Sequence, residues 1–353
     1  MQTKDFHFEL PEELIAQVPS ARRGGDRLLV LDRSTGKTED RLFSEIADIV
    51  EPGTLMVFND SRVRRARVYA TVESTGSEAE FLLIAPMAIP GFEPSRVWKA
   101  MARNAKRQKV GRAYRFADGT RAEIVEDASV DLSGTEFRLL AFERAIGDDW
   151  LERNGHLPLP PYIKRGDELS DADRYQTVYA RNVGSVAAPT AGLHFTDGTL
   201  AALDARGIER ATVTLHVGLG TFLPVRADRI EEHVMHEESY SVSEDTAERV
   251  TRAKREGRPV LAVGTTSIRT LESAWDESGG RLRAGESSTG IFIYPGYRFK
   301  VVDRVFTNFH TPESTLLMLV SAFAGKERIF AAYEHAIAER YRFFSYGDSM
   351  LIR

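Results

Sequence analysis

Residues 67–84 read RVYATVESTGSEAEFLLI, in which two runs of mainly β-branched, aromatic and apolar residues flank a turn of Ser, Thr and Gly. This pattern predicts two short strands joined by a tight turn. Further short runs of the same kind follow, and the last of them lies at residues 136–142. We therefore expect residues 61–149 to form a small all-β domain, inserted into a chain of different character.

Helix and strand signals alternate on both sides of this segment. Ser44 is expected to cap one helix and Ser243 another, and an apolar strand is expected at 259–263. The length of 353 residues also exceeds what one hydrophobic core usually supports. The expected fold class is therefore α/β, with a mixed α+β main domain formed by residues 1–60 and 150–353.

The sequence contains no cysteine, and 42% of its residues are hydrophobic. This composition allows a buried core but excludes disulfides, thiolate zinc sites, iron–sulfur clusters and a catalytic cysteine. The first 14 residues lack the basic start and apolar stretch of a signal peptide. The longest apolar run, residues 316–324, is too short to cross a bilayer. We expect a cytoplasmic protein that does not enter a membrane.

Positive charge is concentrated in the expected β domain, although the formal net charge of the chain is −5. Residues 62–115 contain 12 Lys and Arg against 4 Asp and Glu, a net of +8, so the remainder carries −13. Within residues 96–115 there is no acidic residue, and Trp98, Tyr114 and Phe116 accompany the cations. The pattern fits either a solvated face or a surface that follows phosphates and stacks on bases.

Five of the eight histidines fall within residues 194–310. Histidine titrates near neutral pH, so we expect at least one of them to act as an acid or a base. A glutamate could share this work if burial raised its pKa. A metal site at His233 and His236 is the alternative, but no third ligand stands at a diagnostic spacing, and we expect no metal. The candidate acid–base residues are His194, His216, His233, His310 and Glu232.

Three further stretches suggest binding. Residues 260–267, VLAVGTTS, read as a buried strand that leads into a helix start, where free N–H groups suit a phosphate or carboxylate; simple capping is the alternative. Gly218 and Gly220 follow another strand but lack the third glycine and the acidic residue of a dinucleotide site. Residues 184–196, GSVAAPTAGLHFT, are uncharged and mostly small, so they form either a substrate-facing or a simply buried loop.

Together these stretches resemble one family, the S-adenosylmethionine:tRNA ribosyltransferase-isomerases of queuosine biosynthesis. The resemblance extends nearly from end to end of the chain. It is carried by 184–196, by TLHVGLGTF at 214–222, VGTTSIRTLES at 263–273 and TNFHTPESTLLMLVSAF at 307–323, and also by RLLVLD at 27–32, VFNDSR at 57–62, RYQTVYA at 174–180 and YRFFSYGDSMLI at 341–352.

The resemblance implies that the ribosyl part of S-adenosylmethionine is transferred to the 7-aminomethyl group of 7-aminomethyl-7-deazaguanine at the wobble position of tRNA, and isomerised. The product is epoxyqueuosine-tRNA, and adenine and methionine are released. Such an enzyme is a pentosyl transferase of EC class 2.4.99, with S-adenosylmethionine as co-substrate and no permanently bound cofactor. The family also implies an antiparallel β-barrel inserted into the mixed domain, and the tRNA anticodon loop as partner. We further expect a monomer.

This reaction needs a base for the 5′ proton, which the sulfonium acidifies, and an acid for the departing adenine. The methionine carboxylate is expected at residues 264–267 with Arg269. The residues expected to bind tRNA phosphates are Arg103, Lys106, Arg107 and Lys109. The residues expected to bind substrate are Thr190, Gly192, Gly218, Gly220, Thr221, Gly264, Thr265, Thr266, Ser267, Arg269 and Asn308.

Two departures from the family pattern affect these expectations. Glu313 stands where a lysine is usual, and Val63 to Arg67 carries extra arginines. An RNA-binding protein without catalysis would explain the basic segment but not the uncharged loops. An ordinary S-adenosylmethionine-dependent methyltransferase would share both the co-substrate and the tRNA. The products of the reaction distinguish the three alternatives.

Overall fold

A computed structural model of the chain describes residues 1–353 except 131, 133–134, 219–224 and 226. It divides into two compact units, which are described separately below. Unit 1 comprises Met1–Arg62 and Pro160–Arg353, and unit 2 comprises Val63–Leu159. Among the described residues, no helix is both long and apolar enough to span a membrane.

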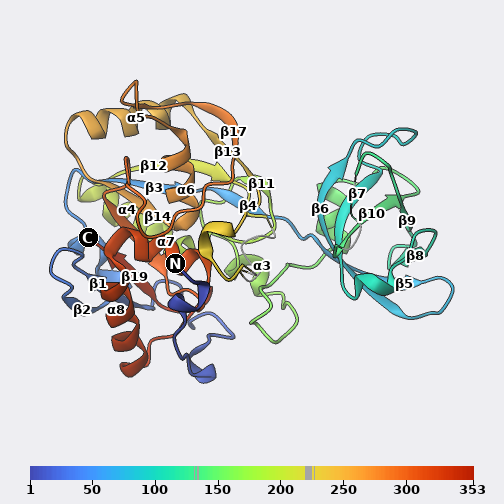
Figure 1. The fold of residues 1–353 in the computed structure, drawn as a ribbon, viewed down its shortest axis with the longest axis horizontal. Helices are drawn as coiled ribbons and strands as arrows, with labels where there is room; N and C mark the ends of the chain where they lie inside the picture. Colours follow the sequence, from blue (N-terminus) through green and yellow to red (C-terminus); the bar gives the residue numbers. More distant parts are fainter. Residues whose placement is uncertain (131, 133–134, 219–224, 226) are drawn as a thin grey trace. The chain divides into compact units, whose positions relative to one another are not determined.

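Unit 1 is built on a nine-stranded mixed sheet, in the order β17-β13-β12-β3-β14-β18-β19-β1-β2 (Figure 1). Four adjacent strands at its centre, β12, β3, β14 and β18, run parallel, so their carboxyl ends share one edge. The strands are β1 (Arg27–Leu31), β2 (Thr38–Leu42), β3 (Leu55–Asn59), β12 (Glu209–Leu215), β13 (Glu238–Val242), β14 (Val260–Val263), β17 (Gly285–Thr289), β18 (Arg304–Asn308) and β19 (Ser349–Ile352).

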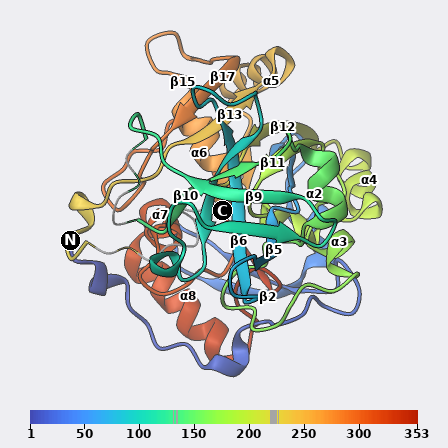
Figure 2. The same cartoon turned by 90° about the vertical axis from the view of Figure 1, so that its right-hand side faces the viewer.

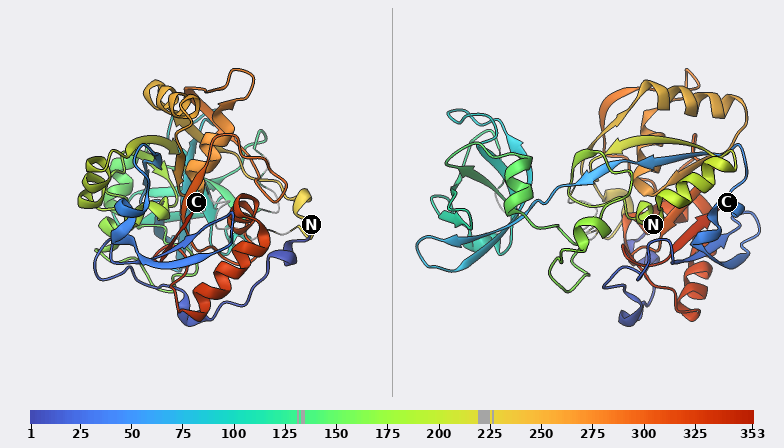
Figure 3. Two further views of the ribbon diagram at one scale, coloured as in Figure 1. Left: turned by 90° about the vertical axis from the view of Figure 1, so that its left-hand side faces the viewer. Right: turned by 180° about the vertical axis from the view of Figure 1, so that it is seen from behind.

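Helices cover this sheet. The segments α5 and α6 pack on β3, β12 and β14, while α7 and α8 pack against each other (Figure 3). The predicted cap at Ser243 is confirmed, because its Oγ accepts a hydrogen bond from the Thr246 amide at 3.1 Å. The helices are α1 (Ile46–Ile49), α3 (Asp171–Arg174), α4 (Asp197–Ala205), α5 (Glu244–Arg255), α6 (Thr265–Ala274), α7 (Thr315–Ala324) and α8 (Lys326–Ala338).

The central strands are buried on both faces, as parallel strands covered by helices usually are. All five residues of β3 are buried, and successive side chains enter different cores. Leu55 and Val57 belong to the core that also contains residues of α5, α6 and α7, whereas Met56 and Phe58 pack with residues of α1 and α4. The two cores hold the strand ends, and with them the loops that follow, in fixed positions.

Unit 2 is a closed barrel of six antiparallel strands in the order β10-β7-β6-β5-β8-β9, followed by the helix α2 (Asp148–Asn154) (Figure 2). The expected α/β class with an antiparallel barrel is thereby confirmed. The strands are β5 (Arg67–Val72), β6 (Glu78–Met87), β7 (Val97–Ala102), β8 (Ala113–Phe116), β9 (Arg121–Val125) and β10 (Phe137–Phe142).

Two small two-stranded sheets pair β4 (Ser61–Val63) with β11 (Asn182–Ser185), and β15 (Trp275–Asp276) with β16 (Arg281–Leu282).

The three aromatic residues of the basic segment lie inside the barrel and do not form a stacking surface. Trp98, Tyr114 and Phe116 are 2%, 0% and 4% exposed and belong to its core. Their burial follows from strand alternation, which sends every second side chain of β7 and β8 inward. The expectation that they stack on bases is therefore wrong, whereas the cations between them remain at the surface.

Candidate functional site

A cavity of about 490 Å³ opens in unit 1 at the carboxyl ends of β14 and β18. This edge of a parallel sheet is where open α/β folds bind their ligands. We call it the strand-end cavity. It is lined mainly by residues 161–162, 187–191, 264–266, 307–316 and 344–345, together with Tyr175, Val217 and Val225.

The strand-end cavity is lined by aromatic side chains and by small polar side chains. Tyr162, Tyr175, Phe309 and Phe344 supply flat apolar surface. Threonine hydroxyls, one amide and one imidazole supply the hydrogen-bonding groups, from Thr190, Thr265, Thr266, Thr307, Asn308 and His310. A mainly apolar lining with a few placed polar groups is typical of a site for a small organic molecule.

Gly264 connects β14 to α6 with a φ of +84°, which a side chain would strain. Its amide donates to the Phe306 carbonyl at 2.8 Å and is therefore not free for an anion. Thr265 and Thr266 line the cavity, whereas Ser267 is fully buried and donates to the Val263 carbonyl. Of the expected carboxylate site, only its first three residues thus face the strand-end cavity.

Arg269, the expected partner of that carboxylate, lies on α6 but does not line the strand-end cavity. It is 4% exposed and forms a buried ion pair with Glu238. The other carboxylate oxygen of Glu238 accepts a hydrogen bond from the Gly218 amide at 2.7 Å. The pair therefore anchors the segment that follows β12.

His310 is the candidate histidine that lines the strand-end cavity. Its side chain is buried, and its Nε2 lies 3.0 Å from the Thr307 hydroxyl. Its backbone amide donates to the Tyr333 hydroxyl at 2.9 Å, which fixes the start of the loop after β18. Burial lowers the pKa of His310 to about 3, because the charged form of the ring would lose its hydration. The ring is therefore neutral at physiological pH.

His194 lies behind the cavity lining and not in it. The ring is 3% exposed; its Nδ1 lies 2.8 Å from Asp26 Oδ2, and its Nε2 lies 3.2 Å from the Asn308 amide nitrogen. Burial would raise the pKa of Asp26, but the hydrogen bond and charge of His194, with help from Ser20 and Arg342, lower it overall. His194 thus reaches the cavity through Asn308, which does line it.

The other acid–base candidates lie outside the strand-end cavity. The ring of His216 lies against Gly184, where an added Cβ would come within 2.8 Å of it. His233 packs edge-on to Phe292, and burial lowers its pKa. Glu232 could act only if buried, but its side chain is 64% exposed.

In the loop of small residues at 184–196, close packing explains why Gly192 is a glycine. A Cβ on Gly192 would lie 2.0 Å from the Tyr179 hydroxyl oxygen, so a side chain does not fit there. Gly192 does not line the cavity, whereas its neighbours Thr190 and Ala191 do. Gly220 and Thr221 lie outside the described residues.

Three polar residues that sequence reasoning missed organise this edge of the sheet. Asn59, at the end of β3, donates to the Leu215 carbonyl at 3.0 Å and to the Thr266 hydroxyl at 3.1 Å. Asp60 accepts from Thr214 at 2.7 Å and from Asn182 at 3.1 Å. Asp26 precedes β1 and orients His194. Each follows or precedes a buried strand, and that position is the signal that would have found them.

No metal centre is evident in the part of the chain that the structure describes, because no three His, Asp or Glu side chains gather there. Glu313 lines the strand-end cavity with a φ of +56°, and its carboxylate lies 3.1 Å from the His7 ring. The unusual residue at this position thus places an acid at the cavity wall.

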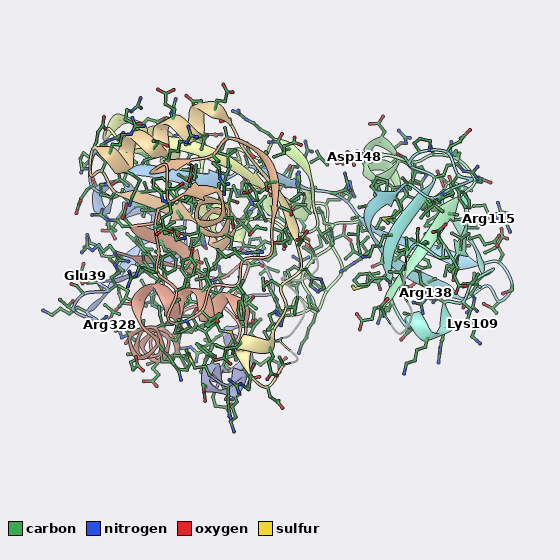
Figure 4. The ribbon with its side chains drawn as sticks, turned by 45° about the horizontal axis from the view of Figure 1, so that its top comes forward. Glu39, Lys109, Arg115, Arg138, Asp148 and Arg328 are labelled. Carbon is green, nitrogen blue, oxygen red and sulfur yellow. The ribbon has the colours of Figure 1, made fainter. Side chains whose placement is uncertain are left out.

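In unit 2, the four expected tRNA contacts lie in and beside a 3-10 turn at Ala105–Arg107, and all four are exposed. Arg103 is paired with Glu80 at 3.0 Å. Figure 4 marks Lys109 and Arg115, both on the barrel. The barrel therefore carries a cluster of exposed cations around this turn.

Comparison with known proteins gives consistent matches. The family model described as queuosine biosynthesis protein matches residues 3–352. Over the full length of both chains, the sequence is 59% identical to the S-adenosylmethionine:tRNA ribosyltransferase-isomerase of Treponema denticola and 46% identical to that of Clostridioides difficile. The crystal structure of the S-adenosylmethionine tRNA ribosyltransferase from Thermotoga maritima is similar, with a TM-score of 0.55 and 35% identity, covering 99% of this chain and 100% of that one.

Proposed function

Because this chain belongs to the queuosine biosynthesis protein family, we propose that it is an S-adenosylmethionine:tRNA ribosyltransferase-isomerase. It transfers the ribosyl part of S-adenosylmethionine to the 7-aminomethyl group of 7-aminomethyl-7-deazaguanine at the wobble position of tRNA and isomerises it. The products are epoxyqueuosine-tRNA, adenine and methionine. The observation that carries this proposal is full-length identity of 46–59% to relatives of that name.

The enzyme is a pentosyl transferase of EC class 2.4.99, and S-adenosylmethionine is a co-substrate that is consumed. It acts in the cytoplasm as a monomer, without a permanently bound cofactor. The strand-end cavity receives S-adenosylmethionine: its volume of about 490 Å³ and its aromatic lining suit a purine nucleoside with a short side chain. Thr190, Thr265 and Thr266 offer hydroxyls to the ribose and the methionine part.

His310 is the base that removes the 5′ proton of the ribose. The assignment rests on its position, because it is the candidate histidine that lines the cavity and its neutral ring has a nitrogen lone pair. Burial makes the ring a weaker base than a free histidine, so the acidity that the sulfonium gives to the 5′ proton must supply much of the driving force. The positive sulfonium stabilises the carbanion that forms, because the two charges are adjacent. Adenine takes up a proton as it leaves.

The barrel supplies tRNA affinity through Arg103, Lys106, Arg107 and Lys109. Their exposure supports this role, since a cation must remain hydrated and reachable to exchange counterions for a phosphate. The anticodon loop is the part of the tRNA that must reach the strand-end cavity, because it carries the reacting base.

The test is an analysis of products. The protein is incubated with labelled S-adenosylmethionine and tRNA bearing 7-aminomethyl-7-deazaguanine at the wobble position. We expect equal amounts of adenine and methionine, and a tRNA nucleoside heavier by the isomerised ribosyl group. Release of S-adenosylhomocysteine would instead identify a methyltransferase, and tRNA binding without any product would identify a binding protein.

A further inference from the structure

Asn308 ends β18 at the strand-end cavity and is 2% exposed. Its two polar atoms are in different situations. The amide nitrogen lies 3.1 Å from the Phe344 carbonyl, 3.5 Å from the Asp348 carbonyl and 3.2 Å from His194 Nε2. The side-chain oxygen is buried and has no hydrogen-bond partner among the described residues.

The orientation of this amide is fixed by its neighbours. Two backbone carbonyls can only accept hydrogen bonds, so the group facing them must be the NH₂ and not the oxygen. The His194 ring lies on the same side of the amide, with its Nε2 3.2 Å from the amide nitrogen. An amide turned the other way would place its oxygen against two carbonyl oxygens.

A buried acceptor without a partner costs free energy unless a ligand satisfies it. All donor capacity of Asn308 is used within the protein, whereas its acceptor is not. Oδ1 is therefore the one polar atom of the Asn308 side chain with hydrogen-bonding capacity left for a ligand, and such a ligand must donate to it.

We propose that Asn308 Oδ1 accepts a hydrogen bond from the exocyclic amino group of the adenine of S-adenosylmethionine, and that Asp26 and His194 are positioning residues that hold the amide for this contact. The proposal rests on the proposed function, which places S-adenosylmethionine in this cavity. Held by Asp26 and His194, Asn308 recognises the 6-amino group of the adenine.

The adenine amine is the donor of S-adenosylmethionine that this environment matches best. Tyr162, Tyr175 and Phe344 line the same cavity and supply flat apolar surface, which suits a purine ring. The α-ammonium is a cation, and the carboxylate of Glu313, which also lines the cavity, is its better partner. A neutral carbonyl among aromatic rings therefore suits the neutral amine.

The arrangement makes a specific prediction about the purine edge. An asparagine with a free amide can bind the 6-amino group and N7 of adenine together. Here the NH₂ is already committed to Phe344, Asp348 and His194, so Asn308 cannot donate to N7. Replacing the 6-amino group by an oxygen should therefore weaken binding, and replacing N7 by carbon should not change the contribution of Asn308.

The experiment uses three non-reacting probes as inhibitors of adenine release from S-adenosylmethionine in the presence of the substrate tRNA. They are S-adenosylhomocysteine, its 6-oxo (inosine) counterpart and its 7-deaza counterpart. For the wild-type protein we expect the 6-oxo probe to have an inhibition constant about 10–100 times higher than S-adenosylhomocysteine, because it leaves a buried acceptor unsatisfied. The 7-deaza probe should stay within about threefold.

Variants assign this discrimination to the network. In Asn308→Leu, which keeps the branched shape of the side chain and removes both polar atoms, the ratio of the 6-oxo to the 6-amino constant should fall to near one. Asp26→Ala should lower the ratio because it releases His194, which a purely structural role in folding would not do. Tyr162→Phe, a cavity residue whose hydroxyl contacts Ser345, is the control and should leave the ratio unchanged.

Each outcome either supports or overturns the inference about Asn308. A wild-type ratio near one, or a full ratio in folded Asn308→Leu, overturns the inference while leaving the proposed function intact. Failure of the wild-type protein to release adenine overturns the proposed function, and the inference with it. If Asn308→Leu does not fold, as judged by its thermal melting, the contrast between Asp26→Ala and Tyr162→Phe decides: equal ratios overturn the inference.

Discussion

Three polar residues at and behind the wall of the strand-end cavity of unit 1 are buried and hydrogen-bonded to one another, whereas several cations of the barrel in unit 2 are exposed. His194, Asp26 and Asn308 form a chain of hydrogen bonds with exposed fractions of 2–7%. Lys106 and Lys109 lie at the surface of the barrel. Burial fixes the orientation and protonation of a group, and exposure leaves its charge available to a partner. This contrast supports the division that we propose, with the chemistry in unit 1 and the electrostatic attraction of tRNA in unit 2.

Two neighbouring buried carboxyl groups in unit 1 have pKa values that are shifted in opposite directions. Asp348 lies beside Asp26, and burial raises its pKa although the backbone amides of Arg342 and Arg27 donate to it. Asp26 keeps a lowered pKa because His194 and Arg342 outweigh its burial. Two neighbouring carboxyls with opposite shifts illustrate how the local partners, and not burial alone, decide the charge.

The largest effect is expected from replacing His310, and it tests whether catalysis belongs to unit 1. Removing a positioned base costs about 10²–10⁴-fold in rate, so His310→Ala should lower kcat by this factor. Affinity for tRNA should stay near the wild-type value, because the barrel is unchanged. Steady-state kinetics of adenine release and tRNA binding by fluorescence anisotropy measure the two quantities.

His233→Ala is the matched control for His310→Ala. Its ring packs on Phe292 and does not line the cavity, so kcat should fall by less than about threefold. If the two variants have similar kcat values, His310 is not the base.

A smaller effect is expected when the exposed cations of the barrel are removed. Replacing Arg103, Lys106, Arg107 and Lys109 by Ala should weaken tRNA binding by about 10²-fold at low salt. The slope of log affinity against log salt should become shallower by about 0.7–0.9 for each phosphate that the variant no longer neutralises. At saturating tRNA, kcat should remain unchanged. Binding titrations between 50 and 200 mM salt, about the range in which such contacts are strongly screened, provide the measurement.

A double replacement with equal charge change sharpens this result. Lys106 and Lys109 are exposed, whereas Arg121 and Arg144 are paired with Glu73 and Asp118. Lys106→Ala with Lys109→Ala should therefore change the salt slope more than Arg121→Ala with Arg144→Ala. Equal changes would mean that only the net charge of the barrel matters.

Sequence patterns predict those elements that local residues determine. The run RVYATV coincides with β5 at Arg67–Val72, and the cap at Ser243 begins α5. The helix expected after Ser44 is present as α1, but it is only four residues long, and Ser44 does not cap it because a 3-10 turn occupies Phe43–Glu45. Glu45 causes this difference, because its carboxylate accepts from the Leu42 amide and caps the turn instead.

The candidate site is less predictable, because its contacts join distant parts of the chain. Asp26 and His194 are 168 residues apart, and nothing local to either residue announces their hydrogen bond. Asn308 ends a buried strand and Thr265 lies just after one, and both line the cavity. Arg269 also follows such a strand, but a helix carries its side chain away to Glu238. Strand ends can therefore be located from the sequence, while the direction of each side chain depends on the packed fold.

The last effect expected is on stability and not on activity or tRNA binding, and it concerns the pH dependence of unfolding. The pKa of His310 is about 3 in the folded protein, against about 6.5 for an unperturbed histidine. Between these values the unfolded chain binds a proton that the folded chain does not, so the free energy of unfolding falls as pH decreases from 6.5 toward 3. His310→Gln should reduce this fall by up to about 1.4 kcal/mol per pH unit. Denaturant titrations at several pH values in this window measure it.

His7 provides the control of opposite sign. Its exposed ring forms a hydrogen bond with the Glu9 carboxylate, and its pKa is raised. The folded chain therefore holds its proton more tightly, and the stabilisation is lost as pH rises through the folded pKa. His7→Gln should leave the acid side of the profile parallel to that of the wild type. The window that matters lies between the ordinary and the lowered pKa of His310, and about pH 6.5 to 4.5 covers most of it. If the stability profile of His310→Gln is also parallel to that of the wild type in this window, the cavity does not hold His310 neutral.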